Sequence, residues 1–350
     1  MAFHIVLDKI TDLDGIAAAA ATGDRPGHAM GQLRDRLGAE VHAPDGDGSA
    51  RWDDRIRSKL IGSPQVWALA RKLASITGAG DTIFCTGEHS GFPVAALAGG
   101  RRDGPRVAMM VHNIDRTRAR AALGIFGLKK RVDLFVSPSR PQIEYLAAAG
   151  YPPEQRQFIF DQTDLGFFSP GPAGPKRRSL VVSVGLEQRD YRTLAAATGE
   201  LDLDVRISGF SNDAALLADT FPETMPANFE RKFYEWRDLA QLYRDADVVV
   251  VAVKPNRYAA GVQALLEAMA SGRPVIVTAS EGLAGYLDDT DALTIVPQQD
   301  PAAMRRAIMA IVTQPETAAA RRRRAREIAV ERYGSDAYVG ALDKALRHLR

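Results

Sequence analysis

The sequence contains a single cysteine, Cys85, and no hydrophobic run long enough to cross a bilayer. One cysteine excludes an internal disulfide and a cysteine-cluster metal site, and its place in an apolar segment is typical of a core thiol. The longest strongly apolar run, Val248 to Val253, is far shorter than the roughly 20 residues of a membrane helix. The first ten residues, MAFHIVLDKI, lack a signal-peptide pattern, so we expect a cytoplasmic protein.

Opposite charges nearly balance, so the chain has no overall field that would attract nucleic acid. Its 45 Lys and Arg and 43 Asp and Glu residues give a formal net charge of +2, and electrostatic partners must be sought in local clusters. One basic cluster, at 321–326, is typical of a solvated helix face. The other surrounds the apolar segment ALGIFGL and comprises Arg116, Arg118, Arg120, Lys129, Lys130 and Arg131.

Short β-branched segments alternate with longer helical patterns along most of the chain, which predicts parallel sheets covered by crossover helices. The 350 residues are too many for one ordinary core and suit two globular domains. The segment SPGPAGPK at 169–176 breaks the alternation with its prolines and glycines. We therefore expect an α/β fold in which two Rossmann-like domains face each other across a cleft.

The predicted domain boundaries follow from this break. An N-terminal, acceptor-side domain covers 1–168, a linker covers 169–177, and a C-terminal domain covers 178–332. Residues 333–350 form a C-terminal helix, with Ser335 as its N-cap, that can pack back on the first domain. Ligands bind beyond the carboxyl ends of strands in open α/β sheets, so the candidate site residues are those that follow strands.

The strongest local signal is a loop of small residues that leads into a helix and then a strand, AAGVQALLEAMASGRPVIVT at 259–278. Gly261 and the free amides at the helix start suit a pyrophosphate, because small residues let a ligand approach the backbone closely. One turn further on, Glu267 can accept two hydrogen bonds from a ribose diol. An ordinary βαβ unit with a surface glutamate would give the same periodicity, and the pattern alone leaves both interpretations open.

Residues 265–276 resemble the signature of the family 4 retaining glycosyltransferases, in which a glutamate, seven residues and a second glutamate run into L-L-E-A-M-A-x-G-x-P-V-I. The resemblance implies that Glu267 binds the ribose hydroxyls of a nucleotide sugar. It also implies that the amides of Gly261 and Val262 serve the donor sugar and the diphosphate. The sequence departs from the family at Ala259, where the first glutamate would stand, so the carboxylate that holds the hydroxyls of the donor sugar is missing.

Two further segments resemble the same family in the same order. SVGLEQRDYRTL at 183–194 is similar to the first strand and loop of the donor domain, with Gly185 at the strand end and Leu186 replacing the family's first basic residue. Arg189 is then the candidate diphosphate clamp, because a guanidinium forms two parallel hydrogen bonds to phosphate oxygens. An exposed loop arginine is the alternative. ISG at 207–209 resembles the next strand end, which places Gly209 beside the nucleotide.

In the first domain, MMVHNID at 109–115 resembles the strand end from which the family places a histidine beside the reacting sugar. His112 is therefore the candidate that orients the acceptor or stabilises charge at the transferring carbon. Glu88 and His89 follow another predicted strand and are further acceptor-side candidates. DQTDLGFFSP at 161–170 resembles the interdomain segment of the family.

The resemblance implies the GT-B fold and a retaining, hexosyltransferase-type transfer from a nucleoside-diphosphate sugar to an acceptor hydroxyl on a glycan, glycolipid or small molecule. It implies no metal and no cofactor, because Arg189 and the helix amides at 261–263 would supply the charge stabilisation. The basic cluster at 116–131 directly follows His112. It either contacts anionic membrane at the inner face, as a peripheral attachment, or forms a mobile charged loop, and both interpretations stay open.

Three other functions fit parts of the sequence. A catalytically silent, glycosyltransferase-like protein that binds nucleotide sugars would explain Ala259. A nucleotide-sugar epimerase shares the architecture but needs several acidic and histidine groups that are not found in the cleft segments. A dinucleotide oxidoreductase is disfavoured, because no G-x-G-x-x-G follows the first strand.

Overall fold

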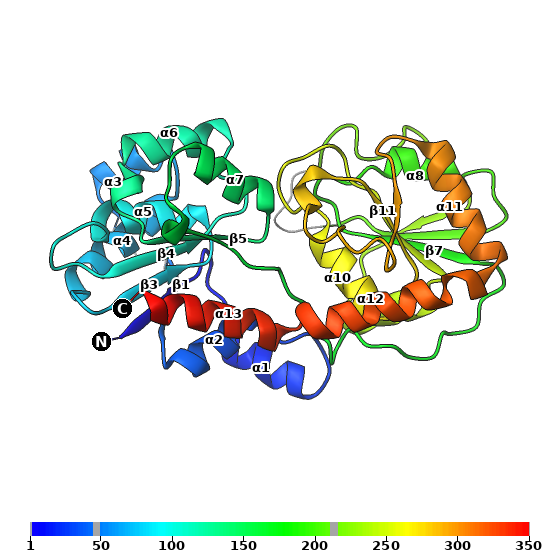
Figure 1. The fold of residues 1–350 in the computed structure, drawn as a ribbon, viewed down its shortest axis with the longest axis horizontal. Coiled ribbons are helices and arrows are strands. Elements are labelled where there is room, and N and C mark those ends of the chain that lie inside the picture. The colour runs from blue at the N-terminus through cyan, green and yellow to red at the C-terminus, as the bar shows by residue number, and fades with distance from the viewer. Residues whose placement is uncertain (1, 45–49, 211–215, 350) are drawn as a thin grey trace. The chain divides into compact units, whose positions relative to one another are not determined.

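The computed structural model describes residues 2–44, 50–210 and 216–349, and it divides the chain into two compact units (Figure 1). The first unit comprises Met1–Ala17, His28–Phe160 and Tyr338–Arg350, and the second comprises Ala18–Gly27 and Asp161–Ala337. Residues 161–168, which the sequence analysis assigns to the first domain, are thus grouped with the second unit. No helix of the described residues is long and apolar enough to span a membrane.

The sheet of the first unit has six described strands, all parallel, in the order β2-β1-β3-β4-β5-β6. They are β1 (Phe3–Val6), β2 (Glu40–His42), β3 (Thr82–Cys85), β4 (Arg106–Met110), β5 (Leu134–Ser137) and β6 (Arg156–Phe158). The central strands read as almost continuous apolar runs because helices cover both faces of the sheet. The order reverses between β1 and β3, and the loops that follow this point of the sheet are where ligands bind in such folds.

Helices on the two faces of this sheet enclose separate apolar cores. One core joins α2 and the C-terminal helix α13, which supplies Val339, Leu342 and Leu346, and Figure 1 shows these two helices side by side below the sheet. The other core contains Trp67, Leu73 and residues of α5. The helices are α1 (Leu13–Ala21), α2 (Ala29–Leu37), α3 (Trp52–Arg57), α4 (Pro64–Ile76), α5 (Glu88–Ala98), α6 (Thr117–Ile125), α7 (Arg140–Ala148) and α13 (Ser335–His348), with short 3-10 turns η1 (Leu128–Lys130) and η2 (Pro153–Gln155).

The second unit repeats this architecture, with six described parallel strands in the order β12-β11-β10-β7-β8-β9. They are β7 (Leu180–Val184), β8 (Asp204–Ser208), β9 (Phe229–Arg231), β10 (Val248–Val251), β11 (Val275–Thr278) and β12 (Thr294–Val296). This is the strand order of the Rossmann fold, in which the direction of winding reverses between the first and fourth strands. The carboxyl ends of β7 and β10 therefore flank the expected ligand crevice of this unit.

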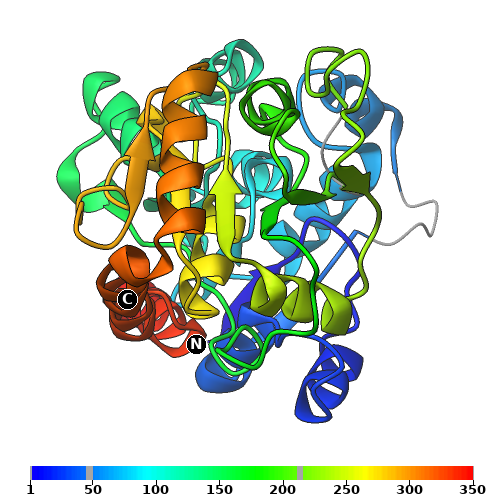
Figure 2. The same cartoon turned by 90° about the vertical axis from the view of Figure 1, so that its right-hand side faces the viewer.

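Capping aspartates mark the starts of two helices of the second unit, α8 and α11. Asp190 accepts a hydrogen bond from the amide of Thr193 at the start of α8, and Asp300 accepts one from Ala303 ahead of a proline in α11. Figure 2 turns this unit toward the viewer and shows α11, in orange, alongside the strands. The helices are α8 (Tyr191–Thr198), α9 (Trp236–Asp245), α10 (Val262–Ala270), α11 (Pro301–Thr313) and α12 (Ala319–Arg332), with η3 (Glu281–Leu283) and η4 (Pro315–Ala318).

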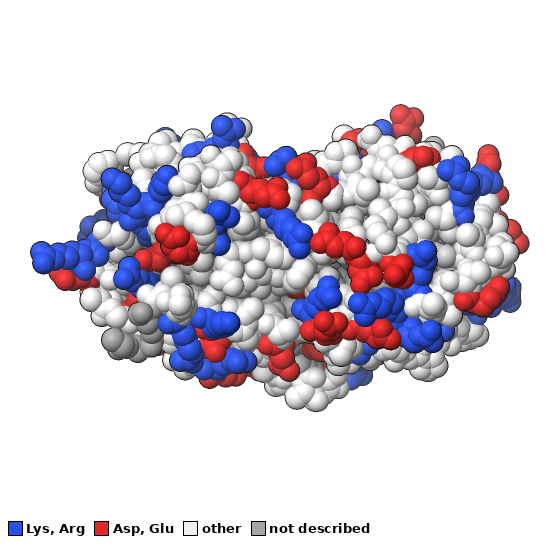
Figure 3. All heavy atoms as spheres, viewed as in Figure 1, with Lys and Arg blue, Asp and Glu red and all other residues white. Residues whose placement is uncertain are grey.

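Basic and acidic side chains are interspersed on the face of each unit drawn in Figure 3. This mixture agrees with the near-zero net charge and provides no broad basic surface on that face.

Candidate functional site

The predicted donor residues of the second unit gather at the carboxyl ends of β7, β8 and β10. Gly185 directly follows β7, Gly209 directly follows β8, and the loop after β10 leads to Gly261 at the start of α10. Arg189 is tied to this loop by an isolated antiparallel bridge with Val253. The fold thus brings these residues to the point where its strand order reverses, which is the place for a ligand in an open α/β sheet.

The guanidinium of Arg189 lies inside this loop cluster rather than on the surface. The residue is only 4% exposed, and its Nε and Nη1 donate to the backbone oxygens of Val184 and Glu187 over 2.9 and 3.0 Å. A β-carbon at Gly261 would lie 3.2 Å from Nη1, and one at Gly185 would collide with Nη2. The alternative of an exposed loop arginine is therefore wrong, and the cation is held between two glycines.

Gly261 stands at a position that suits glycine alone, because of its backbone conformation and because of the lack of room for a side chain. It has a positive φ of 91°, and a β-carbon there would also lie 2.9 Å from Cγ1 of Val253. The amide of Val262 donates to the carbonyl of Ala259 over 3.2 Å, so a phosphate would have to compete with that bond for this amide. The start of α10 is thus a tightly packed turn with the small residues that a close backbone approach needs.

Glu267 is buried in α10, so the surface glutamate of an ordinary βαβ unit is not what the structure contains. Its Oε2 accepts a hydrogen bond of 2.7 Å from the hydroxyl of Tyr243 on α9. Burial raises the pKa of Glu267 to about 7, although Tyr243 and the charge of Arg189 both act to lower it. Tyr243 occupies one carboxylate oxygen, so a ribose diol must bind the other or displace the tyrosine.

Tyr243 is a site residue that the sequence analysis missed. Its ring packs edge-on against Phe168, with the centroids 5.8 Å apart and an interplanar angle of 87°. Phe168 belongs to the segment that resembles an interdomain connection, and it is 2% exposed. The connection therefore supports the tyrosine that in turn positions Glu267. The sequence signal that could have identified Tyr243 is its position on the buried face of the helix that precedes β10.

Aromatic side chains crowd Gly209. A β-carbon at this residue would lie 2.9 Å from Cζ of Phe221 and 3.3 Å from Cε2 of Tyr191. The two rings stack with centroids 5.1 Å apart, and the hydroxyl of Tyr191 donates to the carbonyl of Gly185. Arg231 donates to the Gly209 carbonyl over 3.0 Å and lies over the Phe221 ring. Sequence reasoning missed this support, because its members come from three distant segments.

Lys254 is a second buried basic residue, on a loop bonded to the one that carries Arg189, and the sequence analysis also missed it. Its amide donates to the carbonyl of Gln188 over 2.8 Å, and its side chain, 9% exposed as a residue, forms an ion pair with Asp219. Its position in the loop that follows β10 was the signal that could have identified it. Its ammonium is paired with Asp219, so a diphosphate would have to replace that carboxylate to use this second cation.

In the first unit, the predicted acceptor-side residues take different positions. Glu88 is buried, and its Oε1 accepts hydrogen bonds from the amides of His112 and Asn113 over 2.8 and 2.7 Å. His112 and His89 are both exposed, and Nε2 of His112 lies 3.4 Å from the carbonyl of Thr86. Glu88 thus holds the loop that carries His112, which differs from the prediction that it faces an acceptor.

Only part of the basic segment at 116–131 is exposed and available for contact with another molecule. Leu123 and Leu128 are buried in the core of the first unit, and Ile125 is 68% exposed. Arg131 donates to the carbonyl of Ala96 over 2.8 Å, whereas Lys129 and Lys130 are exposed. The apolar stretch therefore serves mainly the protein's own core.

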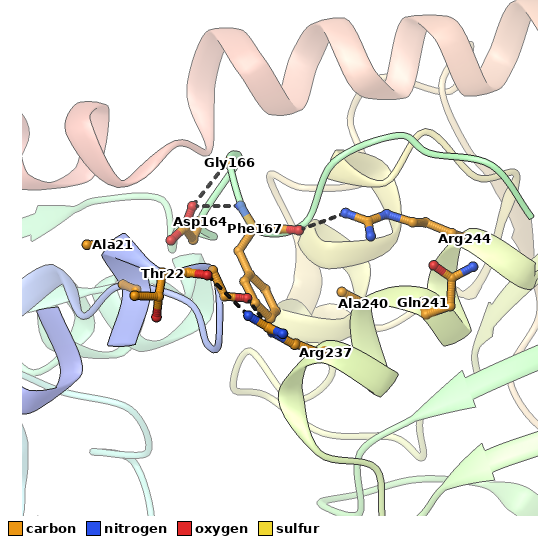
Figure 4. Close-up of a pocket in the computed structure, with 11 residues that line it drawn as sticks. Ala21, Thr22, Asp164, Gly166, Phe167, Arg237, Ala240, Gln241 and Arg244 are labelled. Atoms are coloured by element: carbon orange, nitrogen blue, oxygen red, sulfur yellow. Dashed lines mark hydrogen bonds between the residues drawn. The ribbon is translucent and has the colours of Figure 1, made fainter. Parts of the chain in front are cut away.

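A pocket of about 710 Å³ lies elsewhere in the second unit (Figure 4). Asp164, at its rim, accepts from the amides of Gly166 and Phe167, and Arg237 donates to the carbonyls of Thr22 and Gly23. None of the predicted donor residues, all of which the structure describes, lines it. Its polar groups bond to one another, which favours a structural role in joining 18–27 to the rest of the second unit.

Comparisons with known proteins identify a family match in the second unit and the fold of the chain. Residues 184–314 match the family described as glycosyl transferases group 1. The fold matches a sucrose-phosphate synthase from Thermosynechococcus elongatus with a TM-score of 0.71 and 17% identity, over 100% of this chain and 99% of that one. It also matches Anabaena HepE in complex with UDP-glucose, with a TM-score of 0.68 and 14% identity, over 99% of this chain and 100% of that one.

A glycosyltransferase from Rickettsia africae is similar as well, with a TM-score of 0.67 and 12% identity over 99% of this chain and 98% of that one. No curated protein sequence matches the chain significantly. At these identities the structural matches establish the fold, which is that of the GT-B glycosyltransferases.

Proposed function

We propose that this chain, a glycosyltransferase with a group 1 domain at 184–314, transfers a sugar from a nucleoside-diphosphate donor to an acceptor hydroxyl with retention of anomeric configuration. One observation carries the proposal. The buried guanidinium of Arg189 lies between Gly185 and Gly261 at the reversal point of the sheet. This is a cation held beside a helix start, where a diphosphate is favoured.

The residues divide the work of binding and charge stabilisation. Arg189, with Lys254 on the adjoining loop, would stabilise the charge that develops on the departing nucleoside diphosphate. Glu267 would bind the ribose, and His112 in the first unit would act on the acceptor side. Arg189 and Lys254 supply positive charge without a divalent ion. We therefore propose a metal-independent, hexosyltransferase-type reaction in which the leaving phosphate takes the acceptor proton.

The donor is tested first with UDP-glucose, because the matched Anabaena protein binds it. Thermal shift and isotopic sugar release are measured for UDP-, GDP-, ADP- and TDP-sugars, with and without added Mg²⁺. The variants are Arg189→Lys and Glu267→Gln, with exposed Glu223→Gln as the matched control. We expect one donor to stabilise the wild type and the control, and both site variants to lose that stabilisation. Stabilisation that persists in both site variants would refute this donor site.

Ala259 supports one other function, a catalytically silent protein that binds nucleotide sugars. It stands where the family has the glutamate that holds the donor sugar, and it is only partly buried, so a longer side chain has room. Donor binding with no sugar release in any acceptor extract would favour this function. Sugar release that appears only in Ala259→Glu would show that the wild type is inactive because it lacks this carboxylate.

A further inference from the structure

Two histidines and one glutamate cluster at the edge of the first unit's sheet, where β2 pairs with β1. His4 lies on β1 opposite Glu40, and His42 follows two residues further along β2. Residues two apart on a strand point to the same face, and paired residues on neighbouring strands do too. All three side chains therefore share one face of the sheet, and the functions proposed above use none of them.

The distances within this cluster match those around a metal ion. Nδ1 of His4 lies 3.0 Å from Nε2 of His42, and Oε2 of Glu40 lies 3.7 Å from the first and 3.8 Å from the second. A triangle with these sides has its centre roughly 2.1 Å from each corner, which is the length of a zinc bond to nitrogen or to a carboxylate. An ion at this centre would lie within bonding distance of all three atoms at once.

The three side chains differ in how far they can move, because they are buried to different extents. The side chains of His4 and His42 are 6% and 13% exposed, so the sheet fixes the two imidazoles, whereas that of Glu40 is 68% exposed. The exposed carboxylate can adjust, and solvent can provide a fourth ligand on its side. Two imidazoles, a carboxylate and water form a nitrogen and oxygen set of the kind that zinc prefers.

We propose that His4, Glu40 and His42 form a zinc site that fastens the edge strand β2 to β1. β2 has only three residues, so few backbone hydrogen bonds hold it. An ion that bridges the two strands binds the folded state alone and therefore stabilises it. In the absence of an ion, one imidazole donates to the other. When zinc binds, the donating imidazole takes the tautomer that carries its proton on the other ring nitrogen, so both rings bind the ion as neutral ligands.

The test uses the full chain, freed of metal with a chelator and then titrated with Zn²⁺. Calorimetry and thermal unfolding measure affinity, stoichiometry and stabilisation, and visible absorption of the Co²⁺-loaded protein reports the ligand geometry. We expect one equivalent of Zn²⁺ to bind and to raise Tm. Glu40→Gln and His42→Gln should each weaken binding at least about tenfold. His348→Gln, which removes an exposed histidine of α13, should bind as the wild type does.

Glu40→Gln alters an exposed side chain, so its fold should persist, and its Tm without metal checks this. Equal zinc affinity in the wild type, Glu40→Gln and His42→Gln would overturn the proposal. So would a wild type that binds no zinc, since His4 and His42 would then be only a hydrogen-bonded pair.

Discussion

The hydroxyl of Tyr243 donates a hydrogen bond to Oε2 of Glu267 across 2.7 Å, with both residues buried. Opposing influences act on the carboxyl group. Burial alone raises its pKa, while the tyrosine and Arg189 lower it, and the result is about 7. Glu267 therefore gains or loses its proton near neutral pH, unlike an ordinary surface glutamate.

We expect this raised pKa to make the free energy of unfolding depend on pH. The folded-state pKa lies above the ordinary value of 4.5, so the contribution of Glu267 is complete below about pH 4.5 and is lost as pH rises toward 7. The loss relative to Glu267→Gln should reach up to about 3 kcal/mol. Denaturant unfolding of both proteins from pH 4.5 to 8 measures it. Exposed Glu223→Gln is the control, and parallel curves for wild type and Glu267→Gln would contradict the prediction.

The affinity for a nucleotide sugar should also depend on the ionisation of Glu267. Unlike the stability, the affinity should increase as pH rises. The ionised carboxylate accepts hydrogen bonds from ribose hydroxyls, so affinity for the donor should rise as pH increases through about 7. Tyr243→Phe removes a hydrogen bond that lowers the pKa, and the midpoint should move upward by about one unit. Calorimetry with the intact nucleotide sugar measures both midpoints. A midpoint that stays in place in Tyr243→Phe would mean that the tyrosine does not control this carboxylate.

Gly261→Ala should weaken donor binding more than strain alone would. Gly261 and Gly272 both have positive φ and flank the same helix, but only at Gly261 would the new methyl group meet Val253 and Arg189. We expect Gly272→Ala to cost about 1 kcal/mol of stability and to keep donor affinity. Gly261→Ala should cost about 1–3 kcal/mol and lose affinity as well. Thermal unfolding and donor titration of the two variants separate these effects, and equal affinities would argue against Gly261 as part of the site.

The sequence predicts the order of strands and helices well, because apolar periodicity and capping residues are local. It also predicts Arg189 and Glu267 as donor residues, each from a segment that resembles the same family, and the fold brings both segments to one end of the second sheet. It does not reveal that both are buried, because burial depends on packing between segments distant in sequence. The bonds from Tyr243 to Glu267 and from Glu88 to the loop of His112 escape prediction for the same reason. Each joins side chains or amides that lie 24 residues apart.

The basic cluster at 116–131 remains a candidate membrane contact, with Ile125 as its exposed apolar residue. If it attaches to anionic lipid, binding to vesicles should weaken as salt rises, since surface charges are screened within roughly 10 Å at 0.1 M. Ile125→Glu should weaken binding further by removing apolar insertion and adding negative charge. Vesicle sedimentation at two salt concentrations measures both effects. Exposed Ile10→Glu is the control. The structure forms α6 and η1 here in place of the mobile charged loop, so no sedimentation of the wild type would mean that the cluster is only a solvated helical surface.

Glu88→Ala should loosen the loop that carries His112. The substitution leaves the amides of His112 and Asn113 without their acceptor, which should cost about 2 kcal/mol of unfolding free energy. Glu88→Gln keeps an oxygen that can accept from the same amides, so it should cost less. Hydrogen exchange at the two amides reports the loop directly and should accelerate most in Glu88→Ala. Exposed His89→Ala, one residue along, tests whether any change at the start of α5 has this effect. Unchanged exchange in Glu88→Ala would show that other contacts hold His112 and would return Glu88 to the acceptor-side candidates.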